Sequence, residues 1–225
     1  MKIGALIPAR GGSKRVPRKN LKVLCGKPLI YWTITAAKHS KYIDKVWVSS
    51  EDAEILKVAE NYGADIIKRP KRLATDTVLT EPVIEHFLKK VDLDVLVLIE
   101  PTHPLLTTKD IDIALKKFLN DDYDSLITLE NRKLFMWGIE GNYAYPIDHP
   151  LNYKHRQRTQ KYKGVYVESP GLWITKTRQF KKTKSRVSGL IGYYVIPHMC
   201  IDIDYELDFR LCETILRGCI HPDDY

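Results

Sequence analysis

Hydrophobic and polar positions alternate in blocks along the first part of the chain. Short apolar runs, each of a length that suits a strand, lie at residues 3–8, 46–49, 65–68, 95–99 and 125–129. Between these runs, apolar side chains recur at helical spacing, which predicts amphipathic helices. Strands that alternate with helices are typical of a parallel sheet covered on both faces. We therefore expect an α/β fold with a doubly wound, mostly parallel sheet.

Residues with special backbone properties mark where several of these helices begin and end. Pro28 suits the first turn of a helix, and Gly63 stands where a helix C-cap is expected. Thr107 or Thr108 is suited to cap the helix that follows the run at 95–99. This run is the most hydrophobic of the chain, so we expect it at the centre of the sheet.

The pattern changes between residues 131 and 170, where short aromatic and basic pieces suit hairpins better than another strand and helix. We interpret this segment as an arm inserted into a single domain that covers residues 1–225. Strands are expected again at 172–175, 191–196 and 200–204, and a final amphipathic helix follows them.

Composition and charge narrow the class of protein. The chain has 225 residues, of which 44% are hydrophobic, and its net charge of +8 favours an anionic partner: nucleic acid, an acidic membrane surface or a phosphorylated small molecule. No apolar stretch has the length of a membrane helix, and the N-terminus turns polar too soon for a signal peptide, so we expect a soluble, cytoplasmic protein that binds no membrane. Cys25, Cys200, Cys212 and Cys219 lack the spacing of a zinc or disulfide motif and are expected to be reduced thiols.

A basic, glycine-containing loop follows the first predicted strand, at residues 9–20. Ligands of open α/β sheets bind beyond the carboxyl ends of the strands, which is where this loop begins. Gly11 and Gly12 allow the backbone to approach an anion closely, and Arg10 and Lys19 supply positive charge. The sequence has neither a P-loop nor a dinucleotide-binding fingerprint here. The loop is suited to the phosphates of a nucleotide, although a solvated basic turn would have a similar composition.

The same segment resembles the opening of the acylneuraminate cytidylyltransferases. The string IPARGGSK at residues 7–14 is followed by Lys19-Asn20 and by GKPL at 26–29, which is the order and spacing of that family. The resemblance implies a nucleotide-diphospho-sugar transferase-like, Rossmann-like fold. It also implies a reaction that joins CMP from CTP to the anomeric hydroxyl of a sialic-acid-like nonulosonic acid and releases pyrophosphate. The Lys-Asn pair favours this type over the related transferases for an eight-carbon sugar acid.

The resemblance assigns roles to residues along most of the chain. Arg10 and Lys19 would be catalytic and would bind the nucleotide together with Gly11, Gly12, Ser13 and Asn20. The string RPKRLATDT at 69–77 is similar to the segment that contacts the cytosine base, so Arg69 and Thr80 would recognise the base. Asp76 or Thr77 would also suit the cap of the following helix.

Two segments resemble the part of the family site that binds the acceptor sugar. The string EPTHPL at 100–105 is similar to QPTSPL, which implies contacts from Glu100 and Thr102, but the carboxylate of Glu100 would repel an acidic sugar unless it were protonated or bridged to a cation. In the arm, Arg158 and Gln160 match residues suited to the acceptor's carboxylate. A surface hairpin or dimer contact explains them equally well. Family members pair through such an arm, so we expect a homodimer.

Alternating apolar and acidic residues near the C-terminus, IDID at 201–204, suggest a metal site. In a strand, Asp202 and Asp204 would point to one face, about 6–7 Å apart along the chain, within reach of Mg²⁺ or Mn²⁺. The family carries the same run as its metal site, which also gives Asp202 a catalytic role. The alternative is that Asp204 caps the final helix.

The residues leave three rival functions open. A nucleotidyltransferase of the same fold acting on another sugar acid or a sugar phosphate would fit the substitution at Glu100. Tyr145, Tyr153, Tyr162 and Tyr166, interleaved with basic residues, would suit a module that binds single-stranded nucleic acid, but no nucleic-acid motif is present. An inert relative that only binds ligand is the third. We expect CTP and a nonulosonic acid as partners, and no nucleic acid.

Overall fold

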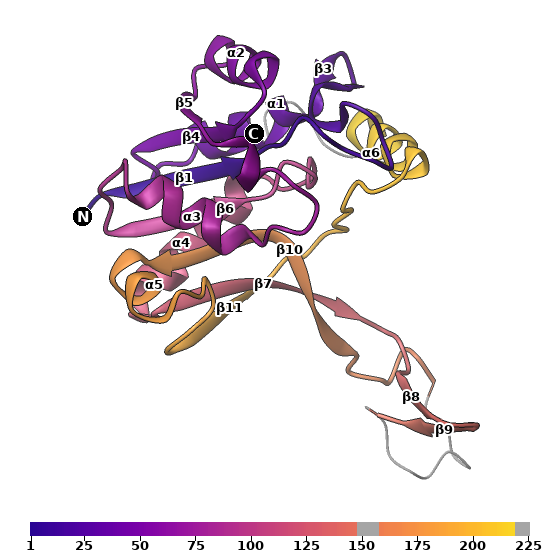
Figure 1. Ribbon diagram of the computed structural model, residues 1–225. Coiled ribbons are helices and arrows are strands. Elements are labelled where there is room, and N and C mark those ends of the chain that lie inside the picture. Colours follow the sequence, from indigo (N-terminus) through magenta and orange to yellow (C-terminus); the bar gives the residue numbers. More distant parts are fainter. Residues whose placement is uncertain (148–157, 219–225) are drawn as a thin grey trace.

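The computed structural model describes residues 1–147 and 158–218 and contains a central sheet of seven strands (Figure 1). The strand order is β11-β7-β10-β6-β1-β4-β5. Only β10 runs antiparallel to its neighbours in this sheet. The strands span β1 (Ile3–Pro8), β4 (Lys45–Ser50), β5 (Asp65–Lys68), β6 (Val95–Ile99), β7 (Ser125–Arg132), β10 (Val165–Lys176) and β11 (Ile191–Val195). The predicted strands in the first part of the chain are confirmed.

Helices cover both faces of the sheet, as a doubly wound fold requires. Side chains on alternate positions of β1 point to opposite faces, so Ala5 and Ile7 join one buried cluster and Leu6 joins another. The first cluster includes residues of α1 (Leu29–Lys38), α2 (Ala53–Asn61) and α4 (Thr108–Asn120). The second includes residues of α3 (Thr80–Leu88) and α5 (Thr177–Thr183).

Local sequence signals end and begin the helices as expected. Pro28 is the N-cap residue of α1, and Gly63 has a φ of +77° just after α2, a value that an L side chain rarely adopts. The Thr107 hydroxyl accepts a hydrogen bond from the backbone N–H of Asp110, whose carboxylate accepts one from the backbone N–H of Thr107. This capping box satisfies donors that the first turn of α4 would otherwise leave unpaired.

A third apolar cluster holds the loop after β1 in place. The side chain of Val16, near the middle of the loop, is 2% exposed and packs with Leu105, Ile203 and Phe209. Phe209 belongs to α6 (Glu206–Gly218), which lies beside the small hairpin of β2 (Val23–Leu24) and β3 (Lys27–Pro28) in Figure 1. Burial of a valine side chain stabilises the folded state by about 1.5–3 kcal/mol, so this contact restricts the loop.

The predicted arm projects away from the sheet (Figure 1). Its base consists of the ends of β7 and β10, and its tip carries the hairpin of β8 (Trp137–Glu140) and β9 (Tyr143–Pro146). A register shift between Glu168 and Trp173 separates the sheet part of β10 from the arm part. Residues 148–157 of the arm, with Tyr153, lie outside the described residues, as does Cys219.

The strand predicted at 200–204 is wrong. These residues form an extended segment without a ladder, held by a hydrogen bond of 2.9 Å from the backbone N–H of Ile203 to the carbonyl of Thr102. The suggested helix cap at Asp204 is wrong too, because α6 begins at Glu206 and the Asp204 carboxylate pairs with Arg15 and Lys19. The carboxylate of Asp208 instead accepts the backbone N–H groups of Asp204 and Tyr205. Apolar alternation alone does not distinguish a strand from an extended segment that buries one side chain.

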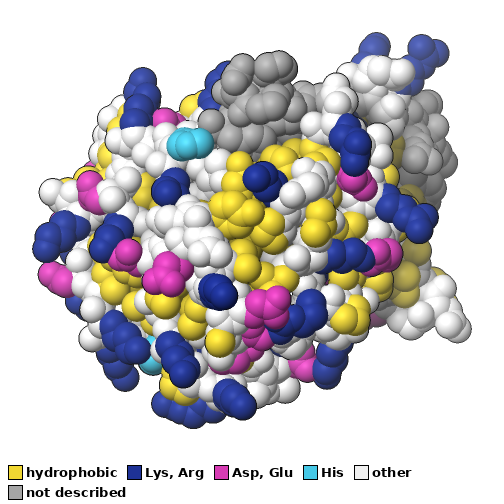
Figure 2. Space-filling view, turned by 90° about the horizontal axis from the view of Figure 1, so that it is seen from above, with side chains coloured by type: hydrophobic (Ala, Val, Ile, Leu, Met, Phe, Trp, Pro, Cys, Tyr) yellow, Lys and Arg dark blue, Asp and Glu magenta, His cyan; other side chains and the backbone are white. Residues whose placement is uncertain are grey.

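Charged side chains are spread over the surface. Figure 2 shows Lys and Arg scattered across the face that is uppermost in Figure 1, with Asp and Glu among them and an apolar patch near the centre. Within residues 1–147 and 158–218, no helix is both long enough and apolar enough to cross a membrane.

Candidate nucleotide site

A cleft of about 510 Å³ opens at the carboxyl ends of β1, β5 and β6. The chain winds from β1 toward β4 and β5 on one side and returns to β6 on the other, so the cleft lies where the direction of winding changes. Open α/β sheets bind ligands at this point. The residues that line it and that the sequence singles out are Arg10, Ser13, Lys19, Asn20, Arg69, Thr80, Glu100, Thr102 and Asp204.

The basic loop crosses the mouth of the cleft toward the segment before α3. Arg10 Nη1 lies 2.6 Å from Asp76 Oδ1, and Lys14 Nζ lies 2.5 Å from Asp76 Oδ2. Lys14 and then Arg10 hold the pKa of the exposed Asp76 carboxyl below its ordinary value. Asp76 therefore pairs with the loop and does not cap α3, whose N-cap residue is Leu79.

Lys19 joins the loop to the acidic segment near the C-terminus. Its ammonium lies 3.4 Å from Asp204 Oδ1 and donates to the carbonyl of Ile203, and Arg15 forms a further ion pair with Asp204. Asp202 lies beside the buried His103, with 4.0 Å between Oδ1 and Nδ1, and is not among the residues that line the cleft. Residues that are far apart in the sequence thus bring positive and negative charge to one edge of the cleft.

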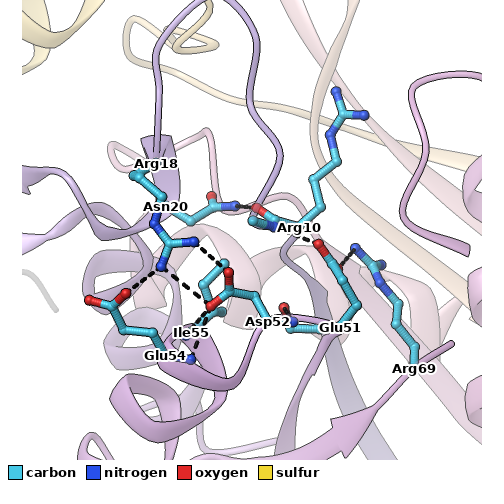
Figure 3. A network of polar contacts seen from close by, with 10 residues as sticks. Arg10, Arg18, Asn20, Glu51, Asp52, Glu54, Ile55 and Arg69 are labelled. Carbon is cyan, nitrogen blue, oxygen red and sulfur yellow. Dashed lines mark hydrogen bonds and ion pairs between the residues drawn. The ribbon is translucent and has the colours of Figure 1, made fainter. Parts of the chain in front are cut away.

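A partly buried polar network supports the loop (Figure 3). The amide of Asn20 donates to the carbonyl of Arg10 at 2.9 Å, so Asn20 closes the loop on itself. Glu51, at the end of β4, accepts the backbone N–H of Gly11 at 2.8 Å and lies 3.5 Å from Nη2 of Arg69. Glu51 was not predicted as a site residue. The signal that could have indicated it is its place directly after a predicted strand, at the sheet edge where ligands bind.

Glu100 and Thr102 lie at the end of β6, on the floor of the cleft. Burial raises the pKa of Glu100 to about 7, and Arg186 is the foremost of the cations that oppose this shift. Arg186 is itself held by Glu81 at 2.7 Å and lies 4.6 Å from the ring centre of Trp173. Arg186 was not predicted as a site residue, because no local pattern indicates that it lies near Glu100.

Several residues that the sequence assigned to the site do not line this cleft. Gly11 uses its N–H for Glu51, and Gly12 is not among the lining residues. Arg158 and Gln160 are exposed on the arm, away from the cleft of their own chain. Their roles stay predictions from the resemblance.

Asp202 and Asp204 are the carboxylates that the sequence assigned to a divalent cation. Within residues 1–147 and 158–218, no group of three or more His, Cys, Asp or Glu side chains is arranged to hold a metal ion. Asp204 nevertheless lines the cleft, and Asp202 lies two residues before it in the same extended segment, beside His103. Mg²⁺ usually takes one or two carboxylates and completes its shell with phosphate oxygens and water, so this pair fits a cation that arrives with a nucleotide.

Comparison with known sequences points to one family. Residues 4–192 match the family model described as cytidylyltransferase. N-acylneuraminate cytidylyltransferase B of Danio rerio is 31% identical over 217 residues, which cover 95% of this chain and 51% of that protein. The pseudaminic acid cytidylyltransferase of Campylobacter jejuni is 30% identical over 234 residues, which cover 96% of this chain and 97% of that protein. The chain spans about half the length of the N-acylneuraminate cytidylyltransferases that it matches.

Comparison with solved structures supports the same fold. CMP:2-keto-3-deoxy-manno-octonic acid synthetase complexed with CTP superposes with a TM-score of 0.76 at 16% identity, over 98% of this chain and 100% of that one. The 2-C-methyl-D-erythritol 4-phosphate cytidylyltransferase from Thermus thermophilus superposes with a TM-score of 0.64 at 13% identity, over 96% of this chain and 100% of that one. At these identities the likeness establishes the fold.

Proposed function

Because this chain belongs to the cytidylyltransferase family, we propose that it transfers CMP from CTP to the anomeric hydroxyl of a sialic-acid-like nonulosonic acid and releases pyrophosphate. The observation that carries the proposal is the single cleft that gathers Arg10, Lys19 and Arg69 beside Asp204. Relatives named for N-acylneuraminate and for pseudaminic acid support a nonulosonic acid as the acceptor.

The proposed chemistry requires positioning and neutralisation of charge. The acceptor hydroxyl attacks the α-phosphorus of CTP in line, and pyrophosphate leaves. Arg10 and Lys19 lie where they would neutralise phosphate oxygens, and Arg69 lies deeper, where it would meet the base. Glu100 and Thr102 form the part of the floor proposed for the acceptor.

We propose Mg²⁺, or Mn²⁺, as the cofactor, held by Asp202 and Asp204. When bound, such a cation supplies positive charge to the phosphate groups. Lys19 and Arg15 are the residues of this chain that offset the charge of Asp204 from the protein side.

We propose that the protein works as a homodimer through its arm. Ile139 and Tyr143 on the terminal hairpin are 79% and 81% exposed, and a two-stranded hairpin is only marginally stable without a packing partner. Arg158 and Gln160 on the same arm would then contribute to the cleft of the second copy. A cytoplasmic location is also proposed, in keeping with the free thiols of Cys25, Cys200 and Cys212.

The proposed reaction is tested by pyrophosphate release with CTP and Mg²⁺ over a panel of acceptors. The panel contains N-acetylneuraminate, other nonulosonic acids and the eight-carbon sugar acid. We expect release with a nonulosonic acid, and a loss of roughly 100-fold or more in Asp202→Ala, since a carboxylate that holds the metal would be gone. Release with the eight-carbon acid alone would indicate a different acceptor class. No pyrophosphate release with any acid, despite saturable CTP binding, would contradict the proposal.

A further inference from the structure

The carboxylate of Glu51 lies between two parts of the nucleotide site that are far apart in the sequence, the basic loop and Arg69. Oε1 of Glu51 accepts the backbone N–H of Gly11 in the basic loop, and Oε2 faces Nη2 of Arg69. We propose that Glu51 is a positioning residue that aligns Arg69 with the basic loop, so that recognition of the cytosine base and seating of the triphosphate depend on one side chain. This inference rests on the proposed use of CTP.

The surroundings of Arg69 make its position sensitive to Glu51. Arg69 is 5% exposed, and burial lowers its pKa, while Glu51 is the foremost group that favours its charged form. Its contact with Glu51 is long, at 3.5 Å, and Nε has no hydrogen-bond partner within the described residues. A guanidinium carries five N–H donors, so Arg69 keeps donors for the adjacent acceptors O2 and N3 of cytosine. N3 of uracil carries a proton and cannot accept, so a well-placed Arg69 would favour CTP over UTP.

The loop approaches Glu51 closely because residue 11 has no side chain. A Cβ atom at Gly11 would overlap the carboxylate of Asp52, which is held in place by Arg18 and by the first N–H groups of α2. Arg18 lies at the far end of the loop, so its pair with Asp52 joins that end to the same turn (Figure 3). The acidic turn between β4 and α2 therefore contacts the loop near both ends, through Gly11 and Arg18. Glu51 is the residue of this turn that also contacts Arg69.

Two substitutions separate the two contacts of Glu51, and a third, at Glu54, is the control. Glu51→Gln keeps the shape and a neutral acceptor for the N–H of Gly11 but removes the charge beside Arg69. Glu51→Ala removes both contacts, the one with the N–H of Gly11 and the one with Arg69. Glu54→Gln is the matched control, because the Glu54 side chain is 67% exposed and pairs with Arg18 at the surface. Exposed ion pairs of this kind contribute little, so the control should bind like the wild type.

The test is equilibrium binding of CTP, UTP and inorganic triphosphate, measured by titration calorimetry on the full chain. For Glu51→Gln we expect triphosphate affinity within about twofold of the wild type, CTP affinity lower by about tenfold and a reduced preference for CTP over UTP. Glu51→Ala should weaken the binding of both CTP and triphosphate. A merely structural role would not change the CTP to UTP ratio, and thermal unfolding of Glu51→Gln establishes that the variant is folded.

The inference is overturned if Glu51→Gln keeps the wild-type ratio of CTP to UTP affinity, or if it weakens triphosphate and CTP equally. The two proposals fail in different ways. Wild-type protein that binds CTP but transfers CMP to no acid would contradict the proposed function and leave the role of Glu51 standing. Transfer by the wild type with unchanged base preference in Glu51→Gln would contradict only the inference.

Discussion

Glu100 shows how a single environment changes the chemistry of a residue. It lies on the floor of the cleft, and burial raises its pKa to about 7 against the influence of Arg186, Arg69 and Lys19. Below that pH the protonated form dominates, so the side chain is a neutral hydrogen-bonding group, as a glutamine would be. Above it the carboxylate dominates and repels an acidic acceptor. Glu100 is thus protonated, as an acidic sugar would require, at and below neutral pH.

We predict that the KM for the acceptor acid rises by about fivefold between about pH 6 and about pH 8, as Glu100 loses its proton. Glu100→Gln should flatten this rise, because the glutamine has no charge at either pH. Initial rates at saturating CTP over this range measure the effect. The KM for CTP serves as the control and should have the same pH profile in both proteins. An unchanged slope for the acceptor would show that Glu100 is not the group that titrates.

At the scale of elements, a buried carboxylate joins α4 to the chain that follows β11. Oδ2 of Asp110 lies 2.7 Å from Nε2 of His198, and Oδ1 accepts the hydroxyl of Tyr194 at 3.0 Å. The hydrogen bond to Asp110 raises the pKa of His198, while His198 and Thr107 together lower that of Asp110. The segment held in this way leads directly to Asp202 and Asp204. The contact therefore helps to position the proposed metal ligands.

The stability of this contact depends on pH. Because the pKa of His198 is raised above its ordinary 6.5, its stabilisation is complete below about pH 6.5 and is lost as pH rises through the raised value. We predict that His198→Asn lowers the free energy of unfolding by about 1–2 kcal/mol near pH 6, and by less near pH 9. Urea unfolding at both pH values measures the difference, with the exposed His39→Asn as the control. A pH-independent difference would indicate a contribution from packing alone.

At the scale of the whole molecule, the proposed dimer would divide substrate binding between two copies. Arg10, Lys19 and Arg69, which are proposed to bind CTP, line one cleft. Arg158 and Gln160, which are proposed to bind the acceptor, are exposed on the arm. Binding of CTP should therefore need only one copy, and binding of the acceptor should need two.

We predict that Ile139→Asp, at the exposed tip of the arm, converts a dimer to a monomer, because a buried unpaired carboxylate is costly. Dimer affinity should fall by about tenfold or more, and CMP transfer should fall with it, while CTP affinity stays unchanged. Sedimentation velocity and calorimetry measure these effects. The control is Ile113→Asp on α4, where the isoleucine is 40% exposed. Wild-type protein that sediments as a monomer at all concentrations would contradict the prediction.

Local sequence determined most of the elements. The predicted bounds of β1, β5 and β6 agree with the structure, and Gly63 and Thr107 mark helix ends as expected. These features depend on neighbours within a few residues, through apolar periodicity and capping, which a single sequence records. The family also followed from motifs that are continuous in the chain, such as residues 7–14.

Tertiary structure alone decided which distant residues meet. Gly11 and Glu51 are 40 positions apart, and Lys19 and Ile203 are 184 positions apart, so no local pattern indicated either contact. The same reason explains the missed proximity of Arg186 to Glu100 and the antiparallel direction of β10. It also explains why 201–204 is extended without being a strand: the burial of Ile203 against Val16 and Phe209, with no ladder beside it, exists only once the chain has folded.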